Sequence, residues 1–220
     1  MFAGDITSPH RRWAAWADSF FVDHAFFRLA WHNFAAVAAG RLYRANHPTP
    51  AFLARMTRRY GIRTIINLRG PRACGSDALT REAAHRLGLT HIYAPFESRG
   101  APHRERILNL AEIFAGMREP ALIHCKSGAD RAGLAAGLFI LLTGGTSRAA
   151  LAQLSWRFLH IRASATGILD AFFEMYASEA EGKKPFLDWV RDDYHEERLR
   201  AAFHPSRAAS LLNDRVLARE

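Results

Sequence analysis

The sequence contains little cysteine and no long uninterrupted apolar run. Its 220 residues include only two cysteines, Cys74 and Cys125, which are too few for the disulfide framework of a small secreted domain or for a cysteine-based zinc site. The most apolar stretch, residues 13–40, is broken by Asp18, Asp23 and other polar residues, whereas a membrane-spanning helix needs about 18 consecutive apolar residues. We therefore expect a soluble, cytoplasmic protein whose chain is not processed.

Internal repeats, low-complexity tracts and paired metal-ligand spacings are missing as well. The histidines His32, His160 and His195 show no such spacing, so we assign them no role and expect no metal site. With 49% hydrophobic and 23% charged residues, the composition is that of an ordinary globular protein, and its length fits one domain with appendages. The net charge of +9 favours an anionic partner.

Periodicity divides the chain into three zones. Residues 1–40 are rich in aromatic side chains and lack strand-like alternation, so we expect a helical lead-in, with contact to a membrane surface as an alternative role. Residues 41–200 alternate short β-branched runs with helical patterns, which predicts an α/β domain that includes a helical extension from about residue 146. Residues 201–220 form a basic tail, either a last amphipathic helix or a frayed end.

The fold expected for the middle zone is a small, largely parallel sheet flanked by helices. Strands are predicted at 41–44, 64–68, 91–93 and 121–123. Helices are predicted near 50–60, 79–87, 107–114, 134–142, 147–159, 168–176 and 186–190. Cys74, between the second strand and the helix that follows it, is interpreted as a small core residue.

One stretch carries a chemical pattern, directly after the strand predicted at 121–123. Residues 124–133 read HCKSGADRAG and continue into the apolar helix. In a loop between a strand and a helix, the backbone N–H groups and the helix dipole converge on an anion. The same field favours a thiolate nucleophile at Cys125, and the guanidinium of Arg131 presents two donors to a phosphate. This loop therefore predicts a nucleophile held against a phosphate clamp.

The pattern of His-Cys, five residues and Arg, with Gly inside the loop, resembles the signature of the Cys-based protein tyrosine phosphatase superfamily. The resemblance covers roughly residues 40–144 and is similar in detail to the compact dual-specificity branch of bacteria, because Tyr43-Arg44, Pro48 and the segment 65–69 stand at the expected distances upstream. It implies that the loop, with its Cys-x5-Arg spacing between a strand and a helix, binds phosphate without a metal or another cofactor.

The resemblance also assigns individual roles. Cys125 would take the phosphoryl group as a phosphocysteine, which water then hydrolyses. The phosphate oxygens would be bound by the loop amides and by Arg131. His124 would support the loop. Gly133 and the glycine within the loop would stand at positions where a side chain would crowd the loop or the start of the helix. The predicted phosphate-binding residues are Lys126, Ser127, Gly128, Ala129, Asp130 and Arg131.

Two positions depart from the family pattern. The residue after the arginine is Ala132, where the family often has a hydroxyl that stabilises the departing thiolate. The family also has an Asp general acid roughly thirty residues before the cysteine, and the sequence has Ser98 there. Glu97 is the nearest carboxylic acid and our candidate for the general acid. The alternatives are His103, Glu105 and Asp130, although Asp130 is expected to hydrogen-bond the loop backbone.

These features predict a Cys-dependent phosphatase that acts on phosphorylated Tyr, Ser or Thr of proteins. An alternative keeps the chemistry but changes the substrate to an inositol phosphate or a phospholipid, since the basic charge and Lys126 beside the nucleophile suit a highly anionic ligand. A further alternative is a catalytically weak phosphate-binding protein, because of Ala132 and the missing Asp. The expected partner is a phosphoprotein or another phosphomonoester, and no nucleic acid is expected.

Overall fold

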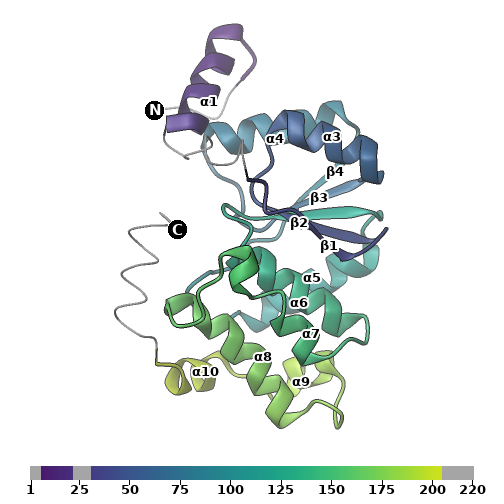
Figure 1. Ribbon diagram of the computed structural model, residues 1–220, viewed down its shortest axis with the longest axis vertical. Helices are drawn as coiled ribbons and strands as arrows, with labels where there is room; N and C mark the ends of the chain where they lie inside the picture. Colours follow the sequence, from purple (N-terminus) through teal and green to yellow (C-terminus); the bar gives the residue numbers. More distant parts are fainter. Residues whose placement is uncertain (1–5, 22–30, 205–220) are drawn as a thin grey trace. The chain divides into compact units, whose positions relative to one another are not determined.

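The computed structural model describes residues 6–21 and 31–204 of the chain. The chain divides into two compact units (Figure 1). The first, called the sheet unit here, comprises residues 1–93 and 117–128, and the second, called the helical unit, comprises residues 94–116 and 129–220.

The sheet unit is built on a five-stranded sheet. Its strand order is β1-β2-β5-β3-β4, in which β1 pairs antiparallel with β2 while all other pairs are parallel. The strands are β1 (Ala35–Ala38), β2 (Leu42–Ala45), β3 (Thr64–Asn67), β4 (Thr90–Tyr93) and β5 (Ala121–His124). This confirms the expected fold class, α/β with a mostly parallel sheet flanked by helices.

The strand β5 occupies the middle of the sheet. All residues of β2, β3 and β5 are buried, as is typical of central parallel strands that are covered on both faces. In the register of the sheet, His124 at the end of β5 lies between Ala45 of β2 and Asn67 of β3. In α/β sheets, ligands bind at the carboxyl ends of the parallel strands. The loop that follows β5 begins at such an end.

The helices α3 (Pro50–Tyr60) and α4 (Gly75–Arg86) belong to the sheet unit. The hydroxyl of Thr49 caps α3 by accepting a hydrogen bond from the Phe52 N–H at 3.2 Å, and Pro50 is suited to its first turn. Gly61 ends the helix with φ +67°, which a glycine adopts without strain. Sequence signals at both ends therefore place α3 as predicted.

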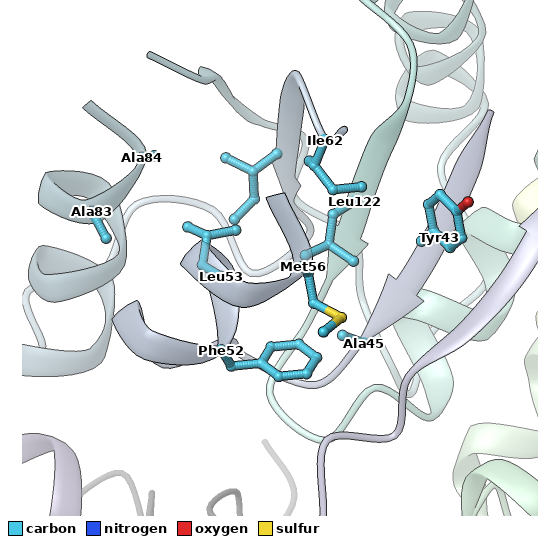
Figure 2. Packing of buried hydrophobic residues seen from close by; sticks show 10 residues of the cluster. Tyr43, Ala45, Phe52, Leu53, Met56, Ile62, Ala83, Ala84 and Leu122 are labelled. Atoms are coloured by element: carbon cyan, nitrogen blue, oxygen red, sulfur yellow. The ribbon is translucent and has the colours of Figure 1, made fainter. Parts of the chain in front are cut away.

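The core of the sheet unit lies between α3 and the sheet (Figure 2). Phe52, Leu53 and Met56 of α3 are buried in one cluster with Tyr43 of β2 and Leu122 of β5. The i, i+1, i+4 spacing of the three helix residues puts them on a single face. Burial of such side chains stabilises the fold by about 1.5–3 kcal/mol each, and it attaches α3 to the central strand β5 and to the neighbouring strand β2.

The helix α1 (Pro9–Phe21) packs on α4. The two backbones approach so closely that a Cβ built at Gly75 would stand 1.9 Å from the carbonyl oxygen of Ala15. The Arg12 guanidinium binds both carboxylate oxygens of Glu82, at 2.6 and 2.7 Å. This packing leaves aromatic side chains of α1 outside the contact, and Trp13 is 76% exposed.

The helical unit has an aromatic core. Its helices are α5 (Arg104–Gly116), α6 (Asp130–Leu142), α7 (Ser147–Leu151), α8 (Ile168–Glu179), α9 (Phe186–Asp192) and α10 (Glu196–Ala202). The ring of Phe172 lies 5.8 Å from that of Trp189 and 5.0 Å from that of Tyr194, measured between centroids. The buried hydroxyl of Tyr194 donates to the carbonyl of Pro102 at 2.7 Å, which ties the chain before α5 to this core.

Three expectations from the sequence are wrong in part. The helical lead-in ends early, because residues 35–38 form β1 by pairing with β2; residues 1–5 and 22–30 of the lead-in lie outside the described residues. The helix predicted at 147–159 ends at Leu151 and is followed by a 3-10 turn, Trp156–Phe158. Cys74 is half-buried at the start of α4 rather than a core residue.

The predicted boundaries of the three zones, with one domain over 41–200, stay a prediction. Of the basic tail, residues 201 and 202 end α10, and residues 205–220 lie outside the described part. None of the helices that the structure describes is both long and apolar enough to cross a membrane.

Candidate active site

The sulfur of Cys125 accepts a hydrogen bond from its own loop. Cys125 directly follows β5 and is 2% exposed. The N–H of Gly128 donates to its Sγ, with a nitrogen-to-sulfur distance of 3.2 Å. A backbone donor aimed at the sulfur stabilises negative charge there, which is what a thiolate nucleophile requires. The four residues from Cys125 to Gly128 thus form a closed turn around the sulfur.

The loop that follows Cys125 is held by its carbonyl groups. The side-chain amide of Asn33 donates to the Ser127 carbonyl at 3.0 Å, and the N–H of His47 donates to the Lys126 carbonyl at 3.2 Å. A third donor, the guanidinium of Arg44, binds the carbonyl of Gly128. In a trans peptide the C=O and the next N–H point in opposite directions. Because the carbonyls face the scaffold, the N–H groups that follow them point away from it, and that of Gly128 points at Sγ of Cys125.

The third donor is the guanidinium of Arg44, which is fully buried. Its Nη2 donates to the Gly128 carbonyl at 2.7 Å. Arg44 lies in β2, next to the central strand, so the sheet itself carries a positive charge to the base of the loop. A charge-assisted bond of this kind is stronger than a neutral one. In the sequence, Arg44 is only a marker of the family resemblance, and no local pattern predicts a role in the site for Asn33, Arg44 or His47.

Gly128 stands at a position of the loop where a side chain would cause strain. Its φ is +75°, a conformation that glycine adopts freely and other residues adopt only with strain. A Cβ at this position would also lie 2.6 Å from the backbone nitrogen of Asn46 and 2.8 Å from the carbonyl carbon of Ala45. The conformation and the close contact both require glycine, as the pattern of the loop predicts.

A buried polar network supports the loop from the ends of β2 and β3. The Arg69 Nη1 lies 3.3 Å from Nδ1 of His47. A guanidinium only donates, so this His47 nitrogen accepts, and Nε2 carries the proton that faces the Ser76 carbonyl at 3.1 Å and the Thr80 hydroxyl at 3.0 Å. His47 is therefore the neutral tautomer with Nε2–H, and its ring is fixed while its backbone N–H binds the loop.

A carboxylate, Asp77, orders the end of β3. Its two oxygens accept from the Asn67 amide at 2.8 Å and from the Tyr93 hydroxyl at 2.9 Å. The Asn67 side chain in turn accepts from the N–H of Arg69 at 2.8 Å. Burial, with the charge of Asp77, raises the pKa of Tyr93, so this hydroxyl remains a donor. The network fixes the turn that carries Arg69.

The second half of the loop opens the helical unit. Ala129 immediately precedes α6, and Asp130 and Arg131 are in its first turn. Both side chains are buried, Asp130 at 3% and Arg131 at 6% exposed. Ala132 and Gly133 follow them inside the same helix and are buried too. The arginine of the motif is thus supplied by a helix terminus, where the dipole also favours an anion.

The Asp130 carboxylate is bound to His160, a histidine with no role predicted from the sequence. Its Oδ1 lies 2.8 Å from Nδ1 of His160, and Nε2 of His160 lies 2.6 Å from Oδ2 of Asp170. Burial lowers the pKa of His160, but the hydrogen bonds and charges of the two carboxylates outweigh it, so that the pKa is raised above 6.5. Spacings of 30 and 10 residues give no local pattern from which this cluster could be predicted.

The candidate general acid, Glu97, is paired with Arg106. Its Oε1 accepts from the Arg106 guanidinium, and Nε2 of His103 lies 3.8 Å from the same oxygen. All three belong to the helical unit. In this pairing the carboxylate is an acceptor, whereas a general acid has to donate a proton. Of the other candidates, Glu105 is exposed in the first turn of α5.

The residues predicted from the motif are therefore distributed over both units. His124, Cys125, Lys126, Ser127 and Gly128 belong to the sheet unit, and Ala129, Asp130, Arg131, Gly133 and Glu97 belong to the helical unit. Within the described residues there is no group of three or more His, Cys, Asp or Glu side chains arranged to hold a metal ion. The chemistry that the described groups support is nucleophilic attack by a sulfur next to anion-binding amides.

Comparison with known proteins places this geometry in a family. Residues 33–155, more than half of the chain, match the family model described as DSP-PTPase phosphatase fused to NAD+ kinase. No curated protein matches the sequence.

Solved structures share the fold. TpbA from P. aeruginosa is 21% identical, with 73% of this chain and 89% of that one covered and a TM-score of 0.53. TpbA in complex with phosphotyrosine is 20% identical over 74% of this chain and 94% of that one, with a TM-score of 0.50. The core catalytic domain of Siw14 from S. cerevisiae, a PP-IP phosphatase, is 20% identical over 70% of this chain and 90% of that one, with a TM-score of 0.55.

Proposed function

Because the chain belongs to the DSP-PTPase phosphatases, as its match to that family model shows, we propose that it hydrolyses phosphomonoesters of protein Tyr, Ser or Thr through a phosphocysteine. The observation that carries this proposal is the Gly128 N–H aimed at Sγ of Cys125 at 3.2 Å, in a loop whose carbonyls are bound to the scaffold. TpbA in complex with phosphotyrosine shares the fold and supports this substrate class.

The first step is attack by the Cys125 sulfur on the phosphorus atom. The S–P bond forms while the bond from phosphorus to the ester oxygen breaks, and the alcohol or phenol leaves with a proton. The loop N–H groups and Arg131 bind the equatorial oxygens and stabilise the charge in the transition state. Arg44 and Asn33 contribute indirectly, because they hold the carbonyls of Gly128 and Ser127 and so set the direction of the N–H groups.

The second step returns the enzyme to its thiolate. Water attacks phosphorus and gives one proton to the Glu97 carboxylate, the S–P bond breaks, and inorganic phosphate leaves. At the position of the family hydroxyl the chain has Ala132, which is buried and has no donor for the departing sulfur. We propose that the Gly128 N–H takes over part of that role, because it already faces Sγ. Glu97 remains our proposed proton donor for the first step, although in the structure it accepts from Arg106.

The experiment is release of inorganic phosphate from an aryl phosphate and from phosphotyrosine, phosphoserine and phosphothreonine peptides, between pH 5 and 8 without added metal. We expect turnover by the parent and none by Cys125→Ser. The matched control is Cys74→Ser, which removes the other cysteine and is expected to leave turnover unchanged. A parent that binds phosphate without releasing it from any ester would contradict the proposal and indicate the phosphate-binding alternative.

A second candidate substrate is an inositol phosphate or a phospholipid headgroup. The observation that favours it is the position of Arg69, two residues after the end of β3. The residue before it, Leu68, lies beside the end of β5, because its N–H donates to the His124 carbonyl at 2.9 Å. A guanidinium at this edge, together with Lys126, adds positive charge for a substrate with several phosphates. Siw14, a PP-IP phosphatase, shares the fold. Faster release from an inositol pyrophosphate than from any phosphopeptide would favour this candidate over the first.

A further inference from the structure

A buried histidine lies between two carboxylates beside the arginine of the loop. Nδ1 of His160 faces Oδ1 of Asp130 at 2.8 Å, and its Nε2 faces Oδ2 of Asp170 at 2.6 Å. The side chains of the three residues are 1%, 4% and 5% exposed for His160, Asp130 and Asp170. We call them the Asp-His-Asp triad. All of its members belong to the helical unit.

The geometry of the triad defines its protonation. Ionised carboxylates only accept hydrogen bonds, and a neutral imidazole has a single N–H. Two short contacts to two carboxylates therefore require an imidazolium with both nitrogens protonated, in agreement with the raised pKa of His160. The triad then carries one net negative charge. With His160 neutral it would carry two, buried from water, which is strongly unfavourable.

The triad connects the first turn of α6 with the first turn of α8. Asp130 opens α6 and directly precedes Arg131, while Asp170 is in the first turn of α8. Asp130 and Asp170 are the charged groups that face His160 from these two helices. On its own segment the nearest charges are Arg157 and Arg162, and Arg162 is exposed and paired with Glu174 at 2.5 Å. The imidazolium is thus neutralised by the two aspartates and not by its neighbours in sequence.

We propose that His160 is a positioning residue for Arg131: its positive charge offsets that of Asp130, and its hydrogen bond to Asp130 holds the first turn of α6, which carries the guanidinium that binds phosphate. This inference rests on the proposed function of the loop. Without the imidazolium, the buried Asp130 carboxylate would lose the positive charge 2.8 Å from its Oδ1, one residue from the phosphate-binding arginine. Such a charge repels an incoming dianion and competes with it for the guanidinium.

The test is anion binding, which does not depend on turnover. In a Cys125→Ser background, where no thiolate titrates, the dissociation constant of inorganic sulfate is measured by calorimetry; sulfate is used because its charge is constant between pH 6 and 9. We expect His160→Gln to weaken sulfate binding at least about tenfold, because removing one partner from a buried charged pair leaves the other charge buried. Adding Asp130→Asn to His160→Gln should restore the binding to within about threefold, because the negative charge of Asp130 is then gone.

The rescue separates positioning from a merely structural role. If His160 only fills space, the double variant will bind sulfate as weakly as His160→Gln or more weakly, which would overturn the inference. Unchanged binding by His160→Gln would overturn it as well. The matched control is His85→Gln, the same change on the exposed face of α4, which should leave sulfate binding and turnover unchanged.

Two further measurements complete the test. If His160→Gln does not fold, judged by circular dichroism, the Cys125→Ser protein itself is titrated with sulfate from pH 6 to 9. Binding must then weaken as the pH rises through the pKa of His160, and a constant affinity would contradict the inference. If Cys125→Ser binds no sulfate at all, the loop is not an anion site, and the proposed function fails together with the inference. Binding that is insensitive to His160 removes only the inference.

Discussion

The Arg44 guanidinium and the Gly128 carbonyl are joined by a hydrogen bond of 2.7 Å inside the protein, where Arg44 is fully buried. A strand of the sheet thereby holds the end of the loop that begins at Cys125. The same carbonyl belongs to the residue whose N–H faces the Cys125 sulfur. Loop geometry, buried charge and the nucleophile are therefore linked through one residue, Gly128.

Replacement of Arg44 tests this link. Arg44→Met keeps an unbranched apolar stem but leaves the Gly128 carbonyl without this donor, and an unsatisfied buried acceptor reduces stability by about 1–3 kcal/mol. We expect a drop of that size in the free energy of unfolding in urea and a KM at least several-fold higher. Arg63→Met, at an exposed position before β3, is the control. A stability equal to that of the parent would show that the bond does not hold the loop.

Gly128→Ala tests the turn around the sulfur. Alanine would be strained at the native φ of +75°, and its Cβ would lie 2.6 Å from the Asn46 nitrogen. The loop therefore has to move. We expect at least a hundredfold loss of phosphate release and a stability loss of about 1–3 kcal/mol, as for other backbone strain. Gly116→Ala, where nothing lies within 4 Å of the new Cβ, should change neither. Full activity of Gly128→Ala would contradict the proposed loop geometry.

The contact between α1 and α4 depends on Gly75. A Cβ there would stand 1.9 Å from the Ala15 carbonyl oxygen, and a backbone atom cannot rotate away as a side chain does. Gly75→Ala should therefore displace α1 from α4, with an expected loss of about 1–3 kcal/mol from overpacking. Limited proteolysis within residues 9–21 would show the release. If α1 remains as protected as in the parent, the close packing is not essential.

His160 makes the stability depend on pH with a definite sign. Its pKa in the folded protein is raised above 6.5, so its contribution to stability is complete below pH 6.5 and is lost as the pH rises through the higher folded value. The difference in the free energy of unfolding between the parent and His160→Gln should therefore be largest near pH 6 and shrink toward pH 9. Chemical denaturation at several pH values measures it. A difference that grows with pH would have the wrong sign.

Glu97→Gln tests the proposed proton donor. A general acid contributes about 10²- to 10⁴-fold when the leaving group is poor and much less when it is good. If Glu97 is the acid, the variant loses activity on phosphoserine peptides, retains it on an aryl phosphate with an acidic phenol, and loses the basic limb of the pH profile. Arg106→Gln removes the partner of Glu97 and separates loss of the pairing from loss of the proton. Equal losses on both substrates would exclude Glu97 as the acid.

Local patterns in the sequence predicted most of the fold. The β-branched runs at β2, β3 and β5 and the capping signals of α3 act over a few residues, so they are legible without tertiary structure. The strand β1 was missed because its sequence, Ala-Ala-Val-Ala, has no alternation of its own. It is a strand because its backbone pairs with β2, a contact made only in the folded chain.

For the site, the sequence by itself determined the consecutive loop from Cys125 to Arg131 and the need for glycine at position 128. These properties follow from residue types at fixed, short spacings. Only the tertiary structure decided what surrounds the loop: Arg44 against the Gly128 carbonyl, and His160 between Asp130 and Asp170. Contacts between residues 30 or 84 positions apart leave no periodic trace in a sequence, because burial and pairing of these charges arise only when the chain has folded.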